Sequence, residues 1–497
     1  MRFLEVLLFS LVLLPLLVRL IPRIRGLHFF RLLWFAAIII TPVQILLEGF
    51  RWQMTPLYFA ALLLACVGIL QFRKENPGDF IIRNKFVRHL FAALLIVILV
   101  ASFIFPALLP VARLPLPKGA YTVGTASFEI NDIMRQEWMT SNPDDTRRFA
   151  VRVWYPADAV ETAHTAPYWD RAGITGKAYS QNAGMGSFWY SHLTLVATNS
   201  IANADISTIR DNYPVVIYSP SFYSLSTDNT MLFEELASNG YIVFSINHTY
   251  ESIVSLFPDG EAIPGDLSYL SDSYPAHADL EEQYYLDYAD TDLLEYKTSL
   301  IQKILTVDES TTAMIRIRTQ DVVSLIDELF LINDGITQFA GKLDLTKICV
   351  MGWSFGGATA LDACVVDNRI QAGINIDGWP YGEQFNAAEA IRQPVLLIRS
   401  ERRDEMEDIV SGLQLEKLDN PACVVSIDGA WHENFWDFPY FFPIYHYLGY
   451  WGPINPNHLL AIESAYILAF LRASFNDSSA DYAAITAGYQ EAELLNP

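Results

Sequence analysis

The sequence is poor in cysteine and in basic residues. Its 497 residues include only four cysteines: Cys66, Cys349, Cys364 and Cys423. None of them belongs to a Cys-x-x-Cys pair or to a Cys/His set with zinc-ligand spacing, so we expect buried free thiols and neither a disulfide framework nor a metal site. Lysine and arginine total 33 against 56 aspartates and glutamates, a formal net charge of −23. A chain this acidic is not expected to bind nucleic acid.

The few basic residues are concentrated at one end of the chain. Residues 1–118 contain 13 Lys or Arg and 4 Asp or Glu, a net charge of +9, whereas the remainder carries −32. Four apolar stretches lie in this basic segment: Phe3–Ile21, Leu32–Leu47, Pro56–Phe72 and Leu90–Val111. A transmembrane helix needs about 20 mostly apolar residues, within a range of about 17–25. The sequence therefore predicts an integral membrane anchor of about four helices over residues 1–117, in which Glu5 and Arg19 make the first stretch the weakest.

The loops between the apolar stretches predict the orientation of this anchor. The second connection contains only one basic residue, Arg51, whereas the first and third contain clusters of them: Arg19, Arg23, Arg25 and Arg31, then Arg73, Lys74, Arg83, Lys85 and Arg88. By the positive-inside rule, the first and third connections are cytoplasmic. The acidic remainder, residues 118–497, is therefore predicted to lie on the extracytoplasmic side.

Apolar strands alternate with helical patterns through residues 118–497. Strands of the fully buried type are expected at Tyr213–Pro220, Tyr241–Asn247, Ile348–Met351, Ala372–Ile376, Val395–Ser400 and Val424–Ile427. This alternation predicts a mostly parallel sheet with helices on both faces. The pattern breaks at about residues 250–306, where acidic residues and tyrosines are frequent. We expect a cap or insertion there rather than a cation site, because no Asp-rich calcium loop is present.

The motif with the clearest chemistry is Gly352-Trp-Ser354-Phe-Gly356. An apolar strand enters it and small, helix-compatible residues follow. In a strand–turn–helix of this kind, the glycines permit a sharp elbow that exposes the serine hydroxyl, so Ser354 is the predicted nucleophile. A glycine-rich turn between a core strand and a helix, with Ser354 only as a cap, is the alternative.

A nucleophilic serine needs a base in contact with it and a third group that orients the base. Of the three histidines that follow Ser354, only His432 lies in the loop just after a predicted strand, whereas His446 and His458 are expected to be structural. In α/β-hydrolases the chain order is serine, acid, histidine. Two strand-end residues, Asp377 and Asp404, fit the place of the acid equally well.

Three segments resemble the platelet-activating-factor acetylhydrolase family of lipases: Gly352–Thr359, Ile374–Trp379 and Gly429–Phe438. The resemblance covers about half of the chain and implies an α/β-hydrolase fold with a triad of Ser354, Asp377 and His432, without a metal or other cofactor. It also implies that the backbone N–H groups of Phe222 and Phe355 form the oxyanion hole. The chain departs from the family here, because Pro220-Ser-Phe222-Tyr replaces the family's His-Gly-Leu-Gly loop.

These observations predict a membrane-anchored serine esterase that acts on short-chain or oxidised phospholipid acyl esters. Ten aromatic residues among the 17 from Phe435 to Trp451 are consistent with a membrane-facing rim or an acyl pocket, and equally with ordinary core packing. A general carboxylesterase and a non-catalytic scaffold or sensor with a hydrolase fold are the alternatives.

Overall fold

The computed structural model describes the chain apart from residues 19–28, 73–83, 138, 159–163, 269–277, 308, 336, 383–390, 402–404, 421, 477–478 and 496–497. The described residues form two compact units. The first, called the helical unit below, comprises Met1–Arg113, Ala172–Val196 and Phe441–Leu448. The second, called the sheet unit, comprises Leu114–Arg171, Ala197–Tyr440 and Gly449–Pro497.

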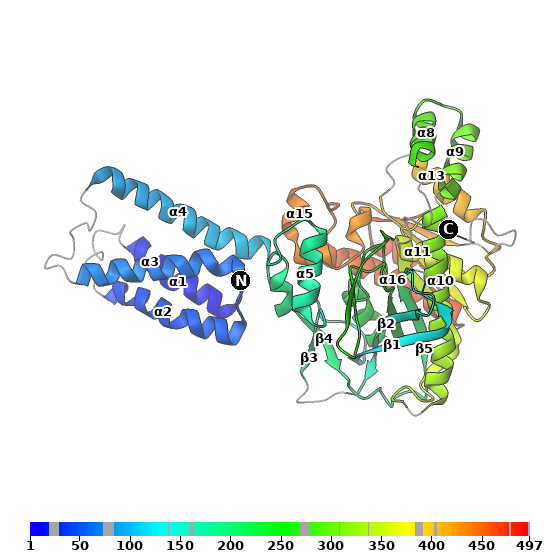
Figure 1. Cartoon of the computed structure of the whole chain (residues 1–497), viewed down its shortest axis with the longest axis horizontal. Coiled ribbons are helices and arrows are strands. Elements are labelled where there is room, and N and C mark those ends of the chain that lie inside the picture. Colours follow the sequence, from blue (N-terminus) through cyan, green and yellow to red (C-terminus); the bar gives the residue numbers. More distant parts are fainter. Residues whose placement is uncertain are drawn as a thin grey trace. The chain divides into compact units, whose positions relative to one another are not determined.

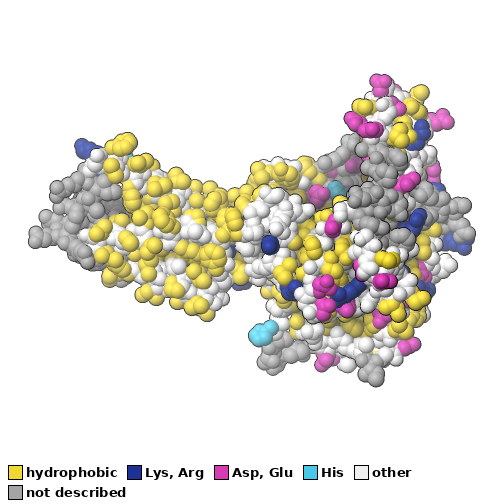
Figure 2. Space-filling view, viewed as in Figure 1, with side chains coloured by type: hydrophobic (Ala, Val, Ile, Leu, Met, Phe, Trp, Pro, Cys, Tyr) yellow, Lys and Arg dark blue, Asp and Glu magenta, His cyan; other side chains and the backbone are white. Residues whose placement is uncertain are grey.

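The helical unit contains the four predicted apolar helices, and Figure 2 shows hydrophobic side chains over most of their visible face. The helices are α1 (Phe3–Val18), α2 (Phe29–Glu48), α3 (Thr55–Phe72) and α4 (Lys85–Leu108). Among the described residues, two stretches are long and apolar enough to cross a membrane, Trp52–Leu70 and Lys85–Leu108. The apolar helices Phe3–Val18 and Leu32–Glu48 are shorter. Four spans are therefore not supported, and most of the basic residues used to predict orientation lie outside the described residues.

A buried ion pair joins distant parts of the helical unit. Arg51 Nη2 lies 2.6 Å from Glu5 Oε2, and Arg51 Nη1 donates to the carbonyl of Leu109 at 3.1 Å. Both charged side chains are fully buried, so each needs the other to offset its desolvation. Trp52 packs its ring against Phe188 and donates from Nε1 to the carbonyl of Trp189 at 3.2 Å.

The remaining segments of the helical unit are short. They are α5 (Ala172–Asn182), η2 (Ser191–Leu195) and α15 (Pro443–Tyr447), with η1 (Trp52–Met54) before α3. Phe442 packs edge-on against the rings of Tyr190 and His192, at centroid distances of 5.2 and 5.6 Å. Aromatic contacts thus join segments of the helical unit that are far apart in the sequence.

An eleven-stranded sheet forms the centre of the sheet unit, in the order β13-β12-β11-β10-β9-β5-β6-β2-β1-β4-β3. The six central strands from β12 to β6 pair in parallel, and β2 is antiparallel to β6. The strands are β1 (Thr122–Gln136), β2 (Thr146–Ala157), β3 (Thr165–Pro167), β4 (Ala197–Ala202), β5 (Tyr213–Ser219), β6 (Ile242–Asn247), β9 (Leu343–Trp353), β10 (Ala372–Ile376), β11 (Val395–Arg399), β12 (Cys423–Ile427) and β13 (Ala492–Leu494). The predicted mostly parallel sheet is confirmed.

Helices cover both faces of this sheet (Figure 1). Helices α6 (Thr230–Ser238) and α16 (Pro456–Ser474) pack on one face, and α10 (Glu309–Asp334) and α11 (Phe355–Val366) on the other. Each face buries its own cluster of aliphatic and aromatic side chains. Five of the six central strands, β5, β6, β10, β11 and β12, are buried along their whole length, which explains why they appear in the sequence as continuous apolar runs.

The region predicted as a cap contains a small hairpin and two helices. These are β7 (Val254–Leu256), β8 (Ala262–Pro264), α8 (Ala278–Ala289) and α9 (Leu294–Val307). Figure 2 shows acidic side chains gathered on α8 and α9. Helices α13 (Glu405–Leu415), α17 (Tyr482–Gly488) and η3 (His432–Asn434) also belong to the sheet unit, as does α14 (Phe438–Phe441) apart from its last residue. All four cysteines are free, but Cys66 is exposed, which corrects the expectation that every thiol is buried.

Candidate active site

Ser354 lies at the turn between strand β9 and helix α11. Its backbone has φ 56° and ψ −120°, a left-handed conformation that non-glycine residues adopt only when the surrounding structure holds them there. The flanking glycines make the turn possible. A Cβ added to Gly356 would lie 1.8 Å from the carbonyl oxygen of Ser219, and one added to Gly352 would lie 2.2 Å from the oxygen of Gly356. The predicted strand–elbow–helix is therefore present.

Asp377 follows the end of the neighbouring strand β10. Its backbone N–H donates to Ile398 at 2.7 Å, and its Oδ1 accepts from both the N–H and the hydroxyl of Ser400, at 2.9 and 3.0 Å. The N–H of Ser354 donates to the carbonyl of Ile376 at 2.8 Å. These bonds place the carboxylate beside the elbow and leave Oδ2 directed at His432.

His432 begins the short helix η3, just after strand β12. Its Nδ1 lies 2.7 Å from Asp377 Oδ2, and its Nε2 lies 2.9 Å from Ser354 Oγ. Asn434 holds this loop, because its Oδ1 accepts from the N–H groups of Trp431 and Gly452. The structure thus brings together the three residues predicted as a triad, in the geometry that a serine nucleophile and its base require.

The charges around the triad favour a basic imidazole. Burial by itself lowers the pKa of His432, but the hydrogen bond and charge of Asp377, with further carboxylates at Glu433 and Glu407, raise it overall. Burial raises the pKa of Asp377, but the His432 hydrogen bond and charge, the Ser400 N–H and the Arg399 guanidinium together lower it. A lowered pKa at Asp377 and a raised pKa at His432 are the directions expected of an orienting acid and a general base.

Phe222 and Phe355 lie close together beside the elbow. Their ring centroids are 5.9 Å apart in an edge-to-face arrangement. Phe355 is the first residue of α11, and Phe222 follows strand β5 in a turn closed by Ser224 N–H and Ser221 C=O. Within the described part of the chain, neither amide nitrogen has a hydrogen-bond acceptor. Both remain predicted oxyanion donors.

The other sequence candidates are one aspartate and two histidines. Asp404, the alternative acid, is outside the described residues. His446 packs beside Tyr447 in α15, and His458 forms a hydrogen bond to Glu491 at 2.9 Å. Among the described residues, no group of three or more His, Cys, Asp or Glu side chains is arranged to hold a metal ion.

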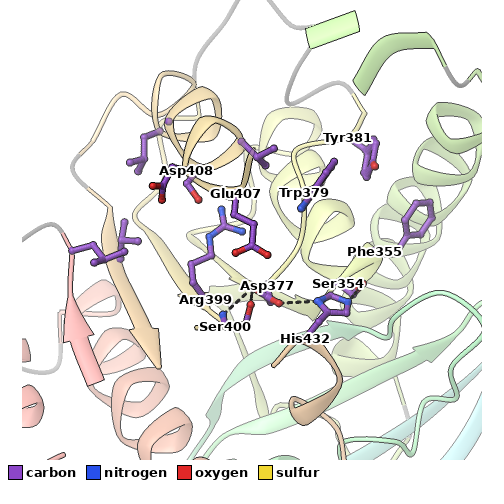
Figure 3. A pocket seen from close by; sticks show the side chains of 16 residues that line it. Ser354, Phe355, Asp377, Trp379, Tyr381, Arg399, Ser400, Glu407, Asp408 and His432 are labelled. Atoms are coloured by element: carbon purple, nitrogen blue, oxygen red, sulfur yellow. Dashed lines mark hydrogen bonds and ion pairs between the residues drawn. The ribbon is translucent and has the colours of Figure 1, made fainter. Parts of the chain in front are cut away.

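A cavity of about 570 Å³ opens above the triad. In Figure 3, Ser354, Asp377 and His432 form its floor, and Glu407, Trp379 and Tyr381 project from the elements around it. Trp379 and Tyr381 are stacked, with ring centroids 6.3 Å apart. Glu407 and Asp408 come from helix α13, opposite this aromatic pair.

Sequence reasoning missed several of these residues. Ser400, which donates hydrogen bonds to Asp377, is the last residue of the predicted strand Val395–Ser400, and its position at a strand end was the available signal for it. Trp379 lies two residues beyond Asp377, in a segment already singled out. Glu407 belongs to no sequence motif. It reaches the cavity because helix α13 packs beside it, and that packing is not visible in the sequence.

The comparison with protein families agrees with this geometry. Residues 109–490 match the model of a family described as "Platelet-activating factor acetylhydrolase, isoform II". The chain belongs to this family. The match extends over nearly the whole sheet unit and includes all three triad positions. Together with the fold, membership of the platelet-activating factor acetylhydrolase family identifies the protein as an ester hydrolase.

Relatives within the family are similar at low identity. Platelet-activating factor acetylhydrolases from Canis lupus familiaris and Bos taurus are 26% and 23% identical to this chain, each over 73% of it and 77% of the relative. The protein of that name from Cavia porcellus is 27% identical over 46% of the chain and 50% of its own length. Among solved structures, a ferulic acid esterase from Streptomyces cinnamoneus superposes with a TM-score of 0.59 at 22% identity, covering 78% of this chain and all of the esterase. That likeness shows the fold, which is consistent with an α/β-hydrolase.

Proposed function

We propose that this protein is a membrane-anchored serine hydrolase that cleaves short-chain or oxidised acyl esters of phospholipids through an acyl-enzyme on Ser354. The continuous chain of hydrogen bonds from Ser354 through His432 to Asp377, at the floor of a cavity, carries the proposal. The names of two relatives support the substrate class, since one is called a platelet-activating factor acetylhydrolase and another a probable 1-alkyl-2-acetylglycerophosphocholine esterase.

The proposed reaction has two halves. His432 Nε2 accepts the Ser354 proton as Ser354 Oγ attacks the acyl carbonyl, and the N–H groups of Phe222 and Phe355 donate to the resulting oxyanion. Collapse of the tetrahedral intermediate breaks the bond to the alcohol, which leaves with the proton from His432. A water molecule then attacks the acyl-enzyme, gives its proton to His432, and releases the carboxylic acid while Ser354 recovers its proton.

The helical unit supports the proposed anchor. Two of its helices have the length and composition of a membrane span, and the uneven distribution of basic residues between the connections favours an extracytoplasmic location for the sheet unit. Attachment outside a membrane would give the cavity access to lipid esters. A reporter fused after Pro497 that is active only in the cytoplasm would contradict this orientation.

Two measurements on the detergent-solubilised full chain test the proposal. A fluorophosphonate probe is expected to label the wild-type protein and not Ser354→Ala, and equal labelling of the two would refute the enzymatic mechanism. A panel from p-nitrophenyl acetate to phospholipids with short, oxidised and long sn-2 chains tests the substrate. Higher kcat/KM for the short and oxidised phospholipids supports the lipid assignment, whereas a preference for non-lipid esters favours a general carboxylesterase.

A further inference from the structure

A second serine–histidine–aspartate array lies beneath the loop that begins at Ser219. Ser219 Oγ is 3.0 Å from His248 Nε2, and His248 Nδ1 is 2.8 Å from Asp321 Oδ2. All three residues are fully buried, with no exposed surface. An ester therefore has no route to Ser219, and this buried array serves the structure around it rather than a second hydrolysis.

Charged groups surround the buried array and fix its protonation. Asp321 accepts from Arg147 at 2.6 Å and from Arg135 at 2.9 Å. Burial, together with the nearby arginines, lowers the pKa of His248 to about 3 despite the hydrogen bond to Asp321. The neutral imidazole donates from Nδ1 to Asp321, so Nε2 accepts from the Ser219 hydroxyl. The first residue of the loop is thereby fixed in place.

The next two residues of the loop are held by Arg318, on helix α10. Its Nη1 donates to the carbonyl of Pro220 at 2.8 Å, and its Nη2 donates to the carbonyl of Ser221 at 3.1 Å. Glu251 pairs with the Nε of Arg318 at 2.8 Å, and both side chains are fully buried. The guanidinium carbon also lies 5.0 Å from the ring centroid of Phe355. One side chain thus contacts both segments that carry the proposed oxyanion donors.

The contact with Ser221 determines where Phe222 directs its N–H. The carbonyl of Ser221 and the N–H of Phe222 belong to one planar peptide unit, and in a trans peptide they point in opposite directions. When Arg318 binds the carbonyl oxygen of Ser221, the N–H of Phe222 must therefore point away from Arg318. A charged donor on the carbonyl also polarises the peptide, which strengthens its N–H as a donor. The loop can thereby be held in one conformation without the two glycines of the family pattern.

We infer that Arg318, held by Glu251, is a positioning residue that orients the Ser221–Phe222 peptide so that the Phe222 N–H faces the oxyanion of the tetrahedral intermediate. This inference rests on the proposed function, because it requires that Phe222 N–H and Ser354 act in the same reaction.

The test compares Arg318→Lys with Arg152→Lys in the full-length protein. Arg152 is a matched control because it too is buried, donates to a backbone carbonyl (Pro167, 3.2 Å) and lies over an aromatic ring (Trp154, 5.3 Å). The readouts are kcat and KM for p-nitrophenyl acetate, normalised to the fluorophosphonate-labelled fraction, and inhibition by an aryl trifluoromethyl ketone. The ketone forms an oxyanion on the nucleophilic serine, so its affinity reports the donors directly.

Lysine retains the charge opposite Glu251 but cannot donate to two carbonyls in the fork geometry of arginine. Loss of one oxyanion donor typically costs about 100- to 1,000-fold in kcat, so misorientation in Arg318→Lys is expected to lower kcat about 10- to 100-fold. KM should stay within about twofold and the ketone should weaken by the same factor as kcat/KM. Arg152→Lys should lower the Tm and leave kcat and ketone affinity unchanged.

Equal kcat and ketone affinity in the two variants, with wild type labelled and active, would overturn the inference and leave the proposed function standing. Absence of labelling in the wild type would refute both. Should Arg318→Lys fail to fold, Glu251→Gln takes its place. It keeps an acceptor for Arg318 but removes the charge, and a kcat equal to that of wild type would likewise overturn the inference.

Discussion

The two serine–histidine–aspartate arrays have the same hydrogen-bond pattern and opposite surroundings. The side chain of His432 is 42% exposed and lines a cavity, whereas the side chain of His248 is fully buried. Carboxylates raise the pKa of His432 against the effect of burial, whereas burial and nearby arginines lower that of His248. Access and the sign of the surrounding charge, rather than the three residue types, therefore distinguish a candidate catalytic triad from a structural one.

The two arrays meet at Ser219. Its side chain belongs to the buried array, while its carbonyl oxygen packs against Gly356 of the nucleophile elbow. The buried array can therefore influence chemistry at Ser354 only by holding the backbone of the loop. This division of roles predicts that variants in the two arrays will fail in different assays.

The largest contrast is expected between the two serines. Ser354→Ala should abolish probe labelling and lower kcat by about 10⁴-fold or more, because it removes the nucleophile. Ser219→Ala should retain labelling and lower the Tm, since it leaves His248 Nε2 buried without its partner, at a cost of about 1–3 kcal/mol. Labelling and differential scanning fluorimetry on both variants measure this. Loss of labelling in Ser219→Ala at full folded content would contradict the comparison.

The two aspartates are expected to separate in the same way. Asp377→Asn should lower kcat by about 10⁴-fold with little change in Tm, because His432 loses the group that selects its tautomer. Asp321→Asn should lower the free energy of unfolding by about 3–5 kcal/mol, because it leaves buried arginines without a counter-charge. Asp404→Asn is the control and should change neither. A greater loss of kcat in Asp404→Asn than in Asp377→Asn would refute the assignment of the acid.

A smaller effect is expected at the junction of the arrays. Gly356→Ala places a Cβ where the Ser219 carbonyl lies, so the elbow and the loop must move apart. We expect kcat to fall about 10- to 100-fold, within the range for a weakened oxyanion hole. The control is Gly173→Ala, where an added Cβ meets nothing within 4 Å. Equal kcat in the two variants would show that the close contact is not needed for catalysis.

The smallest effect concerns the charge above the triad. Glu407 is one of the carboxylates that raise the pKa of His432, and the general base acts in its neutral form. Removing the charge in Glu407→Gln lowers that pKa, so the acid limb of the kcat/KM profile should move to lower pH by a few tenths of a pH unit. A pH–rate profile of both proteins tests the direction. A shift to higher pH would contradict the electrostatic assignment.

The positions of Ser354 and His432 could be predicted from the sequence because their signals are local. Ser354 lies in a five-residue motif with a strand before it, and His432 lies in the loop just after a strand. Asp377 was harder, because strand-end carboxylates occur on two neighbouring strands and only the resemblance to a family favoured one of them. Two hydrogen bonds hold this acid in place. The N–H of Asp377 donates to the carbonyl of Ile398, and the N–H of Ser400 donates to the Asp377 carboxylate. Both bonds link separate strands, so they leave no local pattern in the sequence.

The buried array and Arg318 could not be predicted. Ser219, His248 and Asp321 lie on three different elements, and nothing in the spacing of Arg318 marks it as a neighbour of Pro220. The sheet followed from continuous apolar runs, whereas four membrane spans are not supported. Among the described residues, two stretches, Trp52–Leu70 and Lys85–Leu108, are long and apolar enough to cross a membrane. Hydropathy alone does not distinguish a helix that crosses a bilayer from one that packs within a protein.

The helical unit is assembled from three separate stretches of the chain, which has a consequence for its synthesis. The first 113 residues leave the ribosome long before the partners of Trp52 at Phe188 and Trp189, and before Phe442. Domains tend to fold as units while the chain grows. Helices α1–α4 are therefore synthesised before the residues that complete the aromatic contacts of their unit. The strands up to β12 are already translated by the time Phe442 emerges. The N-terminal segment is therefore synthesised first but is among the last parts of the chain to reach its final packing.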